Sequence, residues 1–443
     1  MNIILALDIG TSKIAAVAFD CSSHETIAVV SAVNQSTVGR LPDGRHEQSP
    51  EIIFKQCLEL LRELTNSNKF TVDTVKAVTF SGQMHGVLLV DEDLKPVTNL
   101  ITWCDQRAVE LTTNISRSDW PVNRTGCYLH PGYGGATLAV LALENQIPFG
   151  STALTIADYV AAKLCGIVAT EPTHAASWGI MDIRNNEWDM EIIKRLQIPP
   201  EVLPKINNSS SLLGTITCET GLPQTVMICS PLGDNQASFI GTCGLESDIL
   251  LLNIGTGGQI SLPCQNFSTH EGLETRPMPF GNFLLVGASL CGGRSYALLK
   301  DFFKDTVYKF TGKELEDGEL YQIMDKLTLE TEQALSVDTR FSGTRMNPLD
   351  RGSISSIGID NFTPAALSLG FMRGMIKELC GMVPLEMLND FTKVMASGNA
   401  VRKSPLAQDL ITEELGIECE LIDSKEEAVT GAALAAAKSL ELI

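Results

Sequence analysis

The sequence predicts an α/β protein of two lobes, each a mixed β-sheet covered by helices. The main observation is a near-repeat: residues 5–12 (LALDIGTS) and residues 250–257 (LLLNIGTG) share one pattern, 245 positions apart. Each copy is an apolar run ending in Asp or Asn, then Gly-Thr, then a second apolar run, which is typical of strand, tight turn and strand. A chain of 443 residues is long enough for two such domains. We therefore expect lobes at residues 1–236 and 237–443.

The first half begins with strands and then alternates helices and strands. Its predicted elements are strands at 3–9, 14–19, 26–32, 75–80 and 225–229 and an amphipathic helix at 51–64. Short connections are expected near residues 232–245, where the two halves meet.

The second half opens in the same way and then becomes mainly helical. Its predicted strands are 249–254, 259–263, 283–287, 393–396 and 418–422, and its predicted helices are 296–303, 364–387, 405–415 and the Ala-rich 425–440. The segment 310–325 is rich in Lys, Glu and Asp, which predicts an exposed insertion.

Charge and cysteine usage narrow the class of protein. A formal charge of −20 argues against a sequence-independent grip on nucleic acid or on an anionic membrane. The 12 cysteines form no Cys-x-x-Cys pair, which is typical of a reduced cytoplasmic protein. Residues 1–10 do not resemble a secretory signal, because Asp8 interrupts the apolar stretch. We expect a cytoplasmic protein that binds small molecules and neither nucleic acid nor membrane.

The two Gly-Thr turns have the chemistry of a phosphate site. Glycine allows close approach and lets backbone N–H groups point outward, and hydroxyl side chains add further donors. A single turn of this kind is as readily an ordinary hairpin, but two in matching register could clamp a phosphate chain. The predicted phosphate contacts are Gly10, Thr11 and Ser12 in the first turn and Gly255, Thr256 and Gly257 in the second.

Asp8 ends a buried strand next to the first turn. A carboxylate there is costly unless it meets a cation or water. The cation that accompanies nucleotide phosphates is Mg²⁺, which one or two carboxylates and water usually hold. We expect Asp8 on the metal side of the site; the alternative is an Asp that caps its own turn.

Two polar clusters in the first half could bind a sugar. Gln83 and His85 follow the strand 75–80, at the carboxyl end where open α/β sheets place ligands. Their amide and imidazole groups suit sugar hydroxyls, although His85 alone is equally a loop histidine. In the second cluster, Asp105 and Arg107 could bind hydroxyls or each other.

Asp234 lies at the junction of the halves, after the strand 225–229. A carboxylate at a strand end is suited to accept a proton from a hydroxyl, and it can also begin a helix at 235–240. Phosphoryl transfer needs little more than a positioned hydroxyl, a base, Mg²⁺ and phosphate donors. The sequence contains no P-loop, no protein-kinase His-Arg-Asp set and no Gly-x-Gly-x-x-Gly before a helix, so a nucleotide would be held in another way.

Taken together, the paired turns, residues 81–86, 233–235 and 343–352 resemble the FGGY family of carbohydrate kinases, in the actin and hexokinase superfamily. The resemblance covers nearly the whole chain. It implies two actin-like (ribonuclease H-like) lobes with the active-site cleft between them. The Ser-Gly-Gln-Met-His-Gly run is similar to the xylulokinase and sedoheptulokinase branch rather than to the glycerol kinase branch. Further matches at residues 158–166, 175–179 and 232–238 are similar to sedoheptulokinases.

The resemblance also implies roles for individual residues. Asp234 would take the proton from the sugar's terminal hydroxyl, and Asp8 would sit on the Mg²⁺ side. The turn residues would contact the nucleotide phosphates, with Gly398 and Asn399 near the adenosine, and Lys13 is left open. The ketose pocket would be lined by Met84 and His85, with Gln83, Asp105 and Asn235 as weaker candidates.

The activity implied is transfer of the γ-phosphoryl group of ATP to the terminal hydroxyl of a ketose. Sedoheptulose, giving sedoheptulose 7-phosphate, is favoured, and xylulose, giving xylulose 5-phosphate, is the alternative. The alternative from another class is a non-catalytic actin-like ATP-binding protein. The loop 81–86 together with Asp234 argues against it, because such a protein needs neither a sugar loop nor a base. The oligomeric state is left open, with a homodimer as the candidate assembly.

Overall fold

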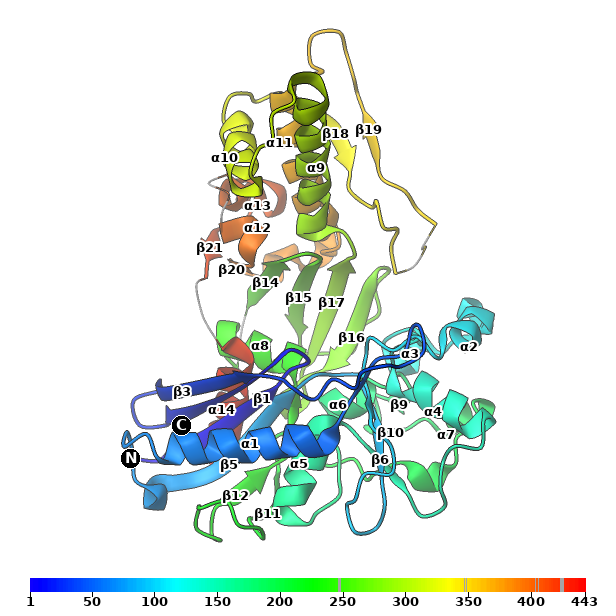
Figure 1. Cartoon of the computed structure of the whole chain (residues 1–443), viewed down its shortest axis with the longest axis vertical. Helices are drawn as coiled ribbons and strands as arrows, with labels where there is room; N and C mark the ends of the chain where they lie inside the picture. Colours follow the sequence, from blue (N-terminus) through cyan, green and yellow to red (C-terminus); the bar gives the residue numbers. More distant parts are fainter. Residues whose placement is uncertain (246–247, 346, 348, 403, 405, 423–425) are drawn as a thin grey trace.

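The computed structural model describes residues 1–443 except 246–247, 346, 348, 403, 405 and 423–425. Two large mixed sheets form the centres of a lower and an upper lobe (Figure 1). The predicted α/β class with two sheet-centred lobes is therefore confirmed. Within the described ranges, no helix is long and apolar enough to cross a membrane.

The sheet of the lower lobe has the strand order β11-β12-β5-β1-β2-β3, and β13 also pairs with β5. These strands are β1 (Ile3–Ile9), β2 (Lys13–Asp20), β3 (Glu25–Val33), β5 (Val75–Gly82), β11 (Leu212–Thr215), β12 (Met227–Cys229) and β13 (Leu232–Gly233). Strand β1 is apolar except for Asp8, because helices cover both faces of the sheet. The helices α1 (Pro50–Thr65) and α5 (Ile156–Cys165) pack on one face and α14 (Glu427–Ser439) on the other.

The sheet of the upper lobe has the order β16-β17-β15-β14-β20-β21. Its strands are β14 (Ile249–Ile254), β15 (Gly258–Cys264), β16 (Leu273–Pro277), β17 (Phe283–Ser289), β20 (Lys393–Ser397) and β21 (Cys419–Leu421). One face is covered by α9 (Gly292–Thr311), α10 (Asp317–Thr328), α11 (Pro364–Cys380) and α13 (Ala407–Leu415). The other face packs on α8 (Asp234–Cys243).

The near-repeat in the sequence corresponds to equivalent units of structure. In the lower lobe β1 pairs antiparallel with β2 and parallel with β5. In the upper lobe β14 pairs antiparallel with β15 and parallel with β20. The two Gly-Thr turns therefore occupy equivalent positions at the ends of β1 and β14.

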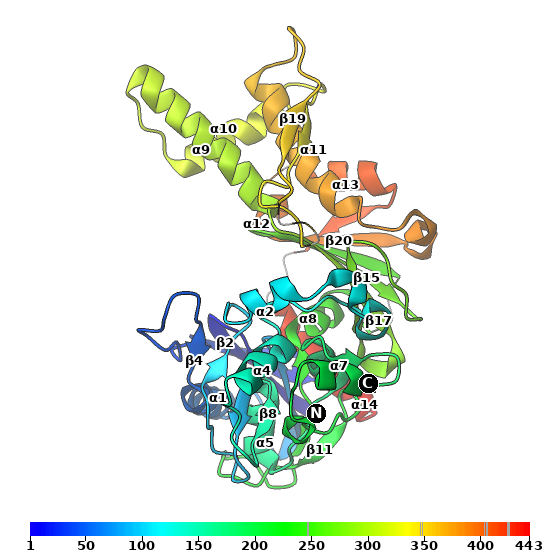
Figure 2. The same cartoon turned by 90° about the vertical axis from the view of Figure 1, so that its right-hand side faces the viewer.

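Smaller elements extend the lower lobe around the loop that follows β5, and a hairpin extends the upper lobe (Figure 2). In the lower lobe they are β4 (Glu47–Gln48), β6 (Leu88–Val90), β7 (Leu100–Ile101), α2 (Val109–Asn114), α3 (Val122–Thr125), α4 (Gly134–Leu143), β8 (Thr152–Leu154), α6 (Pro172–Ala176), β9 (Met181–Asp182), β10 (Glu187–Trp188) and α7 (Met190–Arg195). In the upper lobe the hairpin consists of β18 (Ser336–Asp338) and β19 (Ser353–Ser355), and the short helix α12 (Asn399–Arg402) follows β20.

Three predicted segments differ from the structure. The helix expected at 364–387 ends at Cys380, and Pro384 then precedes a 3₁₀ turn. The expected insertion at 310–325 contains the start of α10, which buries Leu320 and Met324. Their spacing of four residues places both on one helix face, a pattern that the surrounding charges obscured. The short connections expected at 232–245 are instead the helix α8.

Other predicted segments touch residues outside the described ranges. The first residues of the predicted helices at 405–415 and 425–440 lie there, and so do two positions of the 343–352 motif. The described parts of the two helices are α13 and α14.

Helix α14 packs across the predicted boundary between the two lobes, which lies between residues 236 and 237. Although it belongs to the predicted C-terminal lobe, its Val429, Ala433 and Ala436 pack against the sheet of the lower lobe. The boundary stays a prediction.

Helices α8 and α14 lie against each other between the two sheets, and two glycines allow this contact. A Cβ atom at Gly241 would overlap the carbonyl oxygen of Glu427, and one at Gly431 would overlap that of Ala237. Because glycine lacks a Cβ, the two backbones can approach this closely.

Replacing Gly431 with Ala should therefore destabilise the protein, because the added methyl group forces α8 and α14 apart. Overpacking of this kind typically costs about 1–3 kcal/mol. The measurement is thermal unfolding, with Gly39→Ala as the control because a Cβ at Gly39 meets nothing within 4 Å. Equal melting temperatures for the two variants would contradict the close-contact explanation.

Candidate active site

The first Gly-Thr turn is held by two hydrogen bonds at Gly10. The N–H of Gly10 donates to the carbonyl of Lys13 at 3.0 Å, and Asn34 Nδ2 donates to the carbonyl of Gly10 at 2.9 Å. A Cβ at Gly10 would lie 2.8 Å from the Lys13 oxygen, so the turn requires glycine there. Ser12 is exposed at the tip of the turn.

The second turn is braced by the N-terminus of α9. The N–H groups of Gly293 and Arg294 donate to the carbonyls of Gly255 and Thr256 at 2.9 and 3.0 Å. A Cβ at Gly293 would overlap the Gly255 carbonyl, and one at Gly292 would overlap Gly257. The sequence prediction missed Gly292 and Gly293; two adjacent glycines shortly after the strand predicted at 283–287 were the available signal.

The structure also brings Gly398 and Asn399 to the second turn. Gly398 has a φ of 99°, in the region that favours glycine, and a Cβ there would overlap the carbonyl of Ile254. Asn399 is exposed and begins α12. The predicted phosphate and adenosine contacts of the upper lobe are thus neighbours.

Asp8 lies on β1 beside Ser81 of β5, whose hydroxyl donates to its Oδ1 at 2.9 Å. Burial raises the pKa of Asp8, and the nearby charge of Glu426 adds to the increase. Among the described residues, no Lys or Arg forms an ion pair with Asp8, because Lys13 pairs with Glu426 instead. A half-buried carboxylate without a protein cation is suited to bind a metal ion.

Asp234 is the first residue of α8, next to the ends of β5 and β1. The strand β13, which ends at Gly233, pairs with β5 at Ser81 and Gly82. The Gly233 N–H donates to Thr173 Oγ1 at 2.7 Å, which fixes the chain just before Asp234. Burial raises the pKa of Asp234 to about 7, and the charge of Asp8 contributes to the rise.

A buried ion cluster holds the residue after Asp234. Arg276 Nη1 donates to Asn235 Oδ1 at 3.0 Å, and its Nη2 pairs with Glu274 Oε2 at 2.7 Å. Arg345 Nη1 pairs with Glu274 Oε1 at 2.7 Å. Burial opposes the charge of Glu274, but Arg345 and Arg276 hold its pKa well below the usual range. No local pattern in the sequence predicts this cluster, whose members are 2 to 71 residues apart.

His85 is held in one orientation by Ser177 and Tyr133. Its N–H donates to Ser177 Oγ at 3.0 Å, and its Nδ1 lies 2.7 Å from the Ser177 carbonyl. The ring stacks on Tyr133 with a centroid distance of 4.2 Å. Burial and the charge of Arg276 lower the His85 pKa to about 3, so the imidazole is neutral at pH 7. Because a carbonyl only accepts, Nδ1 carries the proton and Nε2 is left as an acceptor.

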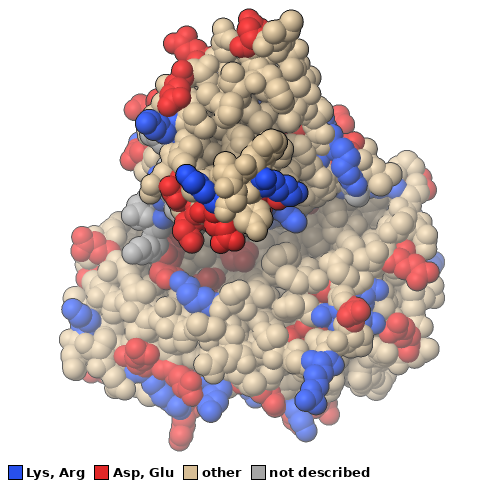
Figure 3. Space-filling model, turned by 45° about the horizontal axis from the view of Figure 1, so that its top comes forward, with Lys and Arg blue, Asp and Glu red and all other residues tan. Residues whose placement is uncertain are grey.

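His85 separates two hollows. The smaller is lined by Met84, Tyr133 and Arg276, and Met84 is almost fully buried. The larger, of about 930 Å³, has Trp103 and Arg345 among its lining residues. In the space-filling view the molecule is hollowed between its two halves (Figure 3).

Gln83 lines neither of these two hollows. It is 2% exposed, and both ends of its amide are engaged with protein groups. Its Oε1 accepts from Thr11 Oγ1 at 3.0 Å, and its Nε2 donates to Gln48 Oε1 at 2.9 Å. Both ends of the Gln83 amide thus bind protein groups, and its role as a sugar contact stays a prediction. The Thr11 hydroxyl is also engaged, so a phosphate contact of Thr11 would have to come from its backbone N–H.

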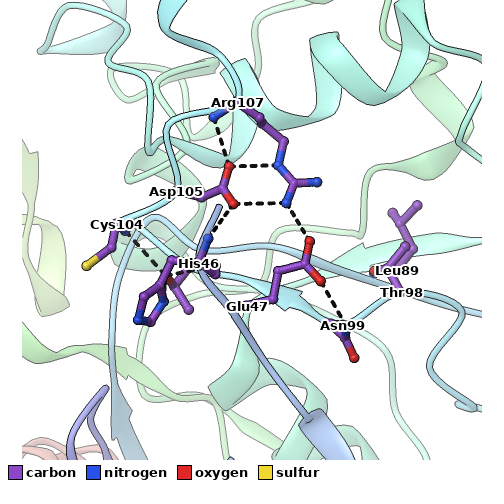
Figure 4. A network of polar contacts seen from close by, with 9 residues as sticks. His46, Glu47, Leu89, Thr98, Asn99, Cys104, Asp105 and Arg107 are labelled. Atoms are coloured by element: carbon purple, nitrogen blue, oxygen red, sulfur yellow. Dashed lines mark hydrogen bonds and ion pairs between the residues drawn. The ribbon is translucent and has the colours of Figure 1, made fainter. Parts of the chain in front are cut away.

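Asp105 binds Arg107, the second of the two alternatives for that cluster (Figure 4). Its Oδ1 accepts from Arg107 N and Nε, and its Oδ2 accepts from Arg107 Nη2 and from the N–H of His46. Arg107 also pairs with Glu47 at 2.6 Å. Asp105 is fully buried, and although burial opposes its charge, Arg107 lowers its pKa. Asp105 therefore anchors its loop, and a contact with sugar stays a prediction.

The arrangement of two lobes with equivalent strand–turn–strand units is the actin-like fold of sugar kinases. A gluconate kinase structure from Lactobacillus acidophilus superposes with a TM-score of 0.85 at 22% identity, over 100% of this chain and 90% of that one. A model of the N-terminal domain of the FGGY family of carbohydrate kinases matches residues 3–241. The chain belongs to the FGGY family of carbohydrate kinases, and it is an ATP-dependent sugar kinase.

The relatives that match over nearly the full length of the chain include sedoheptulokinases and a xylulose kinase. Human sedoheptulokinase is 26% identical, with 98% of this chain and 96% of that protein covered. Xylulose kinase of Haemophilus influenzae is 24% identical, with 98% and 90% covered. The family resemblance inferred from the motifs is thereby confirmed, and the alternative of a non-catalytic actin-like protein is set aside.

Replacing Gly293 with Ala should weaken nucleotide binding, because the new methyl group displaces the second turn. An overpacking cost of about 1–3 kcal/mol corresponds to roughly a 5- to 150-fold rise in the KM for ATP. Steady-state kinetics at saturating sugar measure it. Gly318→Ala in α10 is the control, since a Cβ there meets nothing within 4 Å. An unchanged KM for ATP would show that the turn does not contact the nucleotide.

Proposed function

We propose that this kinase transfers the γ-phosphoryl group of ATP to the terminal hydroxyl of a ketose. The favoured acceptor is sedoheptulose, giving sedoheptulose 7-phosphate, and xylulose is the alternative. The observation that carries the proposal is Asp234, a carboxylate at a strand end whose pKa of about 7 suits a general base. The similarity to sedoheptulokinases and xylulose kinases supports a ketose as acceptor.

The acceptor would occupy the hollows on either side of His85. The neutral imidazole offers Nε2 to a sugar hydroxyl, and Ser177 and Tyr133 prevent the ring from turning away. Arg276 holds the amide oxygen of Asn235, which leaves the Asn235 NH₂ group available as a donor. Asp234 would then remove the hydroxyl proton as the oxygen attacks phosphorus.

The nucleotide phosphates would lie between the two Gly-Thr turns. Asp8 fits the role of a Mg²⁺ ligand, because its half-buried charge lacks a cationic partner among the described residues. Those residues contain no group of three or more His, Cys, Asp or Glu that could hold a metal ion. The remaining ligands would therefore be phosphate oxygens and water, as is usual for Mg²⁺. When bound, the ion neutralises charge on the transferred group.

Several broader assignments belong to the same proposal. Residues 1–236 would carry the sugar site and residues 237–443 most of the nucleotide site, with α14 as a shared element. All twelve cysteines are free thiols, which supports a reducing, cytoplasmic location. A homodimer is retained as the proposed assembly.

The substrate is tested by measuring ADP release with ATP, Mg²⁺ and a panel of acceptors. The panel contains sedoheptulose, xylulose, ribulose, fructose, gluconate and glycerol. We expect the highest kcat/KM on a ketose of five to seven carbons, with sedoheptulose ahead of xylulose. Preference for glycerol or gluconate over every ketose would overturn the proposed substrate class.

Replacing Asp234 with Asn should lower turnover by about 10²- to 10⁴-fold, the usual loss of a positioned general base. The same change should leave stability unchanged or increase it above pH 7. A folded-state pKa raised to about 7, against an ordinary 3.8, means that wild-type stability falls as pH rises between these values. Because Asn carries no charge, the stability of the variant does not fall with rising pH for this reason. Turnover and melting temperature at pH 6 and pH 8 measure both effects.

Asp105→Asn is the matched control, because the chemical change is identical and the electrostatics are opposite. The pKa of Asp105 is lowered, so its pairing with Arg107 stabilises the fold at neutral pH and is lost on acidification. Asp105→Asn should therefore lower the melting temperature at pH 8. Near-normal turnover in a well-folded Asp234→Asn variant would remove Asp234 from the mechanism.

A further inference from the structure

Three side chains beneath the first turn form a closed ring of hydrogen bonds. Thr11 Oγ1 donates to Gln83 Oε1 at 3.0 Å, Gln83 Nε2 donates to Gln48 Oε1 at 2.9 Å, and Gln48 Nε2 donates to the Thr11 carbonyl at 2.8 Å. Gln48 and Gln83 are 0% and 2% exposed. The ring ties the phosphate turn to β4 and to the loop that carries His85.

Trp103 adds a fourth hydrogen bond to this ring. Its Nε1 lies 3.0 Å from Thr11 Oγ1, and an indole N–H can only donate. The hydrogen of the Thr11 hydroxyl is already directed at Gln83, so the hydroxyl oxygen accepts from Trp103. The directions of all four bonds are therefore mutually consistent.

Trp103 also lines the hollow that is proposed to hold the sugar. Trp103 is 50% exposed and lines the 930 Å³ hollow together with His85 and Arg345. A sugar in this hollow would cover the exposed half of the indole. One side chain thus contacts the sugar hollow and the phosphate turn.

The backbone that carries Trp103 is fixed independently of any ligand. Asp105, two residues further on, accepts four hydrogen bonds from Arg107 and His46 (Figure 4). The N–H of Asp105 also donates to the carbonyl of Thr102 at 3.1 Å. The backbone next to Trp103 is thus anchored, and the residue is 50% exposed, with a side-chain hydrogen bond to Thr11.

We propose that Trp103 is a positioning residue that couples the two substrates. Through its bond to Thr11, a sugar that orders the indole also orders the phosphate turn, so that sugar binding tightens nucleotide binding. This inference rests on the proposed function, because it needs the sugar in that hollow. It assigns the Thr11 side chain to coupling rather than to direct phosphate binding.

The physical basis of the coupling is that sugar and nucleotide binding both require the same side chain to be fixed. Fixing a mobile side chain costs conformational entropy, and a second ligand that needs the same side chain fixed does not incur that cost again. Coupling between sites in proteins is typically about 5- to 150-fold in affinity, and it is reciprocal. The nucleotide should therefore tighten sugar binding by the same factor.

The test is isothermal titration of ADP with Mg²⁺, in the presence and absence of saturating sedoheptulose or xylulose, whichever the acceptor panel favours. In the wild type, the ketose should lower the Kd for ADP by about 5-fold or more. Trp103→Phe keeps an aromatic ring and removes the N–H, and it should reduce the factor to about one. Thr11→Val should do the same, whereas Thr11→Ser, which keeps the hydroxyl, should retain the coupling.

Two further variants make the test specific. Trp188→Phe removes an indole N–H that donates to the Pro204 carbonyl at 2.8 Å, away from the hollow, and it should keep the wild-type factor. The double variant Trp103→Phe with Thr11→Val should lose no more coupling than either single change, because both remove one bond. Melting temperatures confirm that each variant is folded.

The outcomes separate this inference from the proposed function. Wild-type coupling in a folded Trp103→Phe variant overturns the inference, and so does a wild type whose ADP affinity the ketose does not change. In both cases turnover of a ketose leaves the proposed function standing. Failure of every ketose in the acceptor panel overturns the proposed function and, with it, the coupling.

Discussion

The close contact between α8 and α14 is the constraint on which the active site depends. Gly241 and Gly431 let the two helices meet backbone to backbone between the sheets. Because α8 begins with Asp234, this contact sets the position of the proposed base. Glu426, directly before α14, pairs with Lys13 at the first turn, so the same helix pair also reaches the phosphate side. The contact thus fixes the base relative to the turn that would hold the phosphate.

Two aspartates show how their surroundings divide one residue type into two roles. Asp105 has four hydrogen-bond donors and a guanidinium partner, which keep its carboxylate ionised and stabilising. Fewer neighbouring groups compensate the negative charge of Asp234, and the charge of Asp8 raises its pKa further. A carboxylate whose charge does not stabilise the fold is suited to proton transfer, since it can gain and lose a proton during the reaction.

The sequence alone predicted the strand–turn–strand units, the class of fold and the places of Asp8 and Asp234. These predictions rest on local patterns, namely apolar runs, Gly-Thr turns and polar residues at strand ends. It did not predict that Thr11 and Gln83 bind each other, because they are 72 positions apart and each offers several donors and acceptors. The same reason explains why the cluster of Glu274, Arg276 and Arg345 was missed. Its members meet through tertiary packing, and no regular spacing in the sequence predicts that contact. The helix α10 was missed because the charged residues in it and just before it are also typical of an exposed segment.

The placement of α14 also determines the order in which the protein can be assembled. The sheet built from the first strands to be synthesised keeps an apolar face uncovered until residues 427–439 pack on it. A chain emerging from the ribosome therefore holds an incomplete lower lobe while the whole upper lobe is made. Exposed apolar surface of this kind favours aggregation and recruits chaperones. The lower lobe is therefore synthesised first but completed only when α14 packs on its sheet.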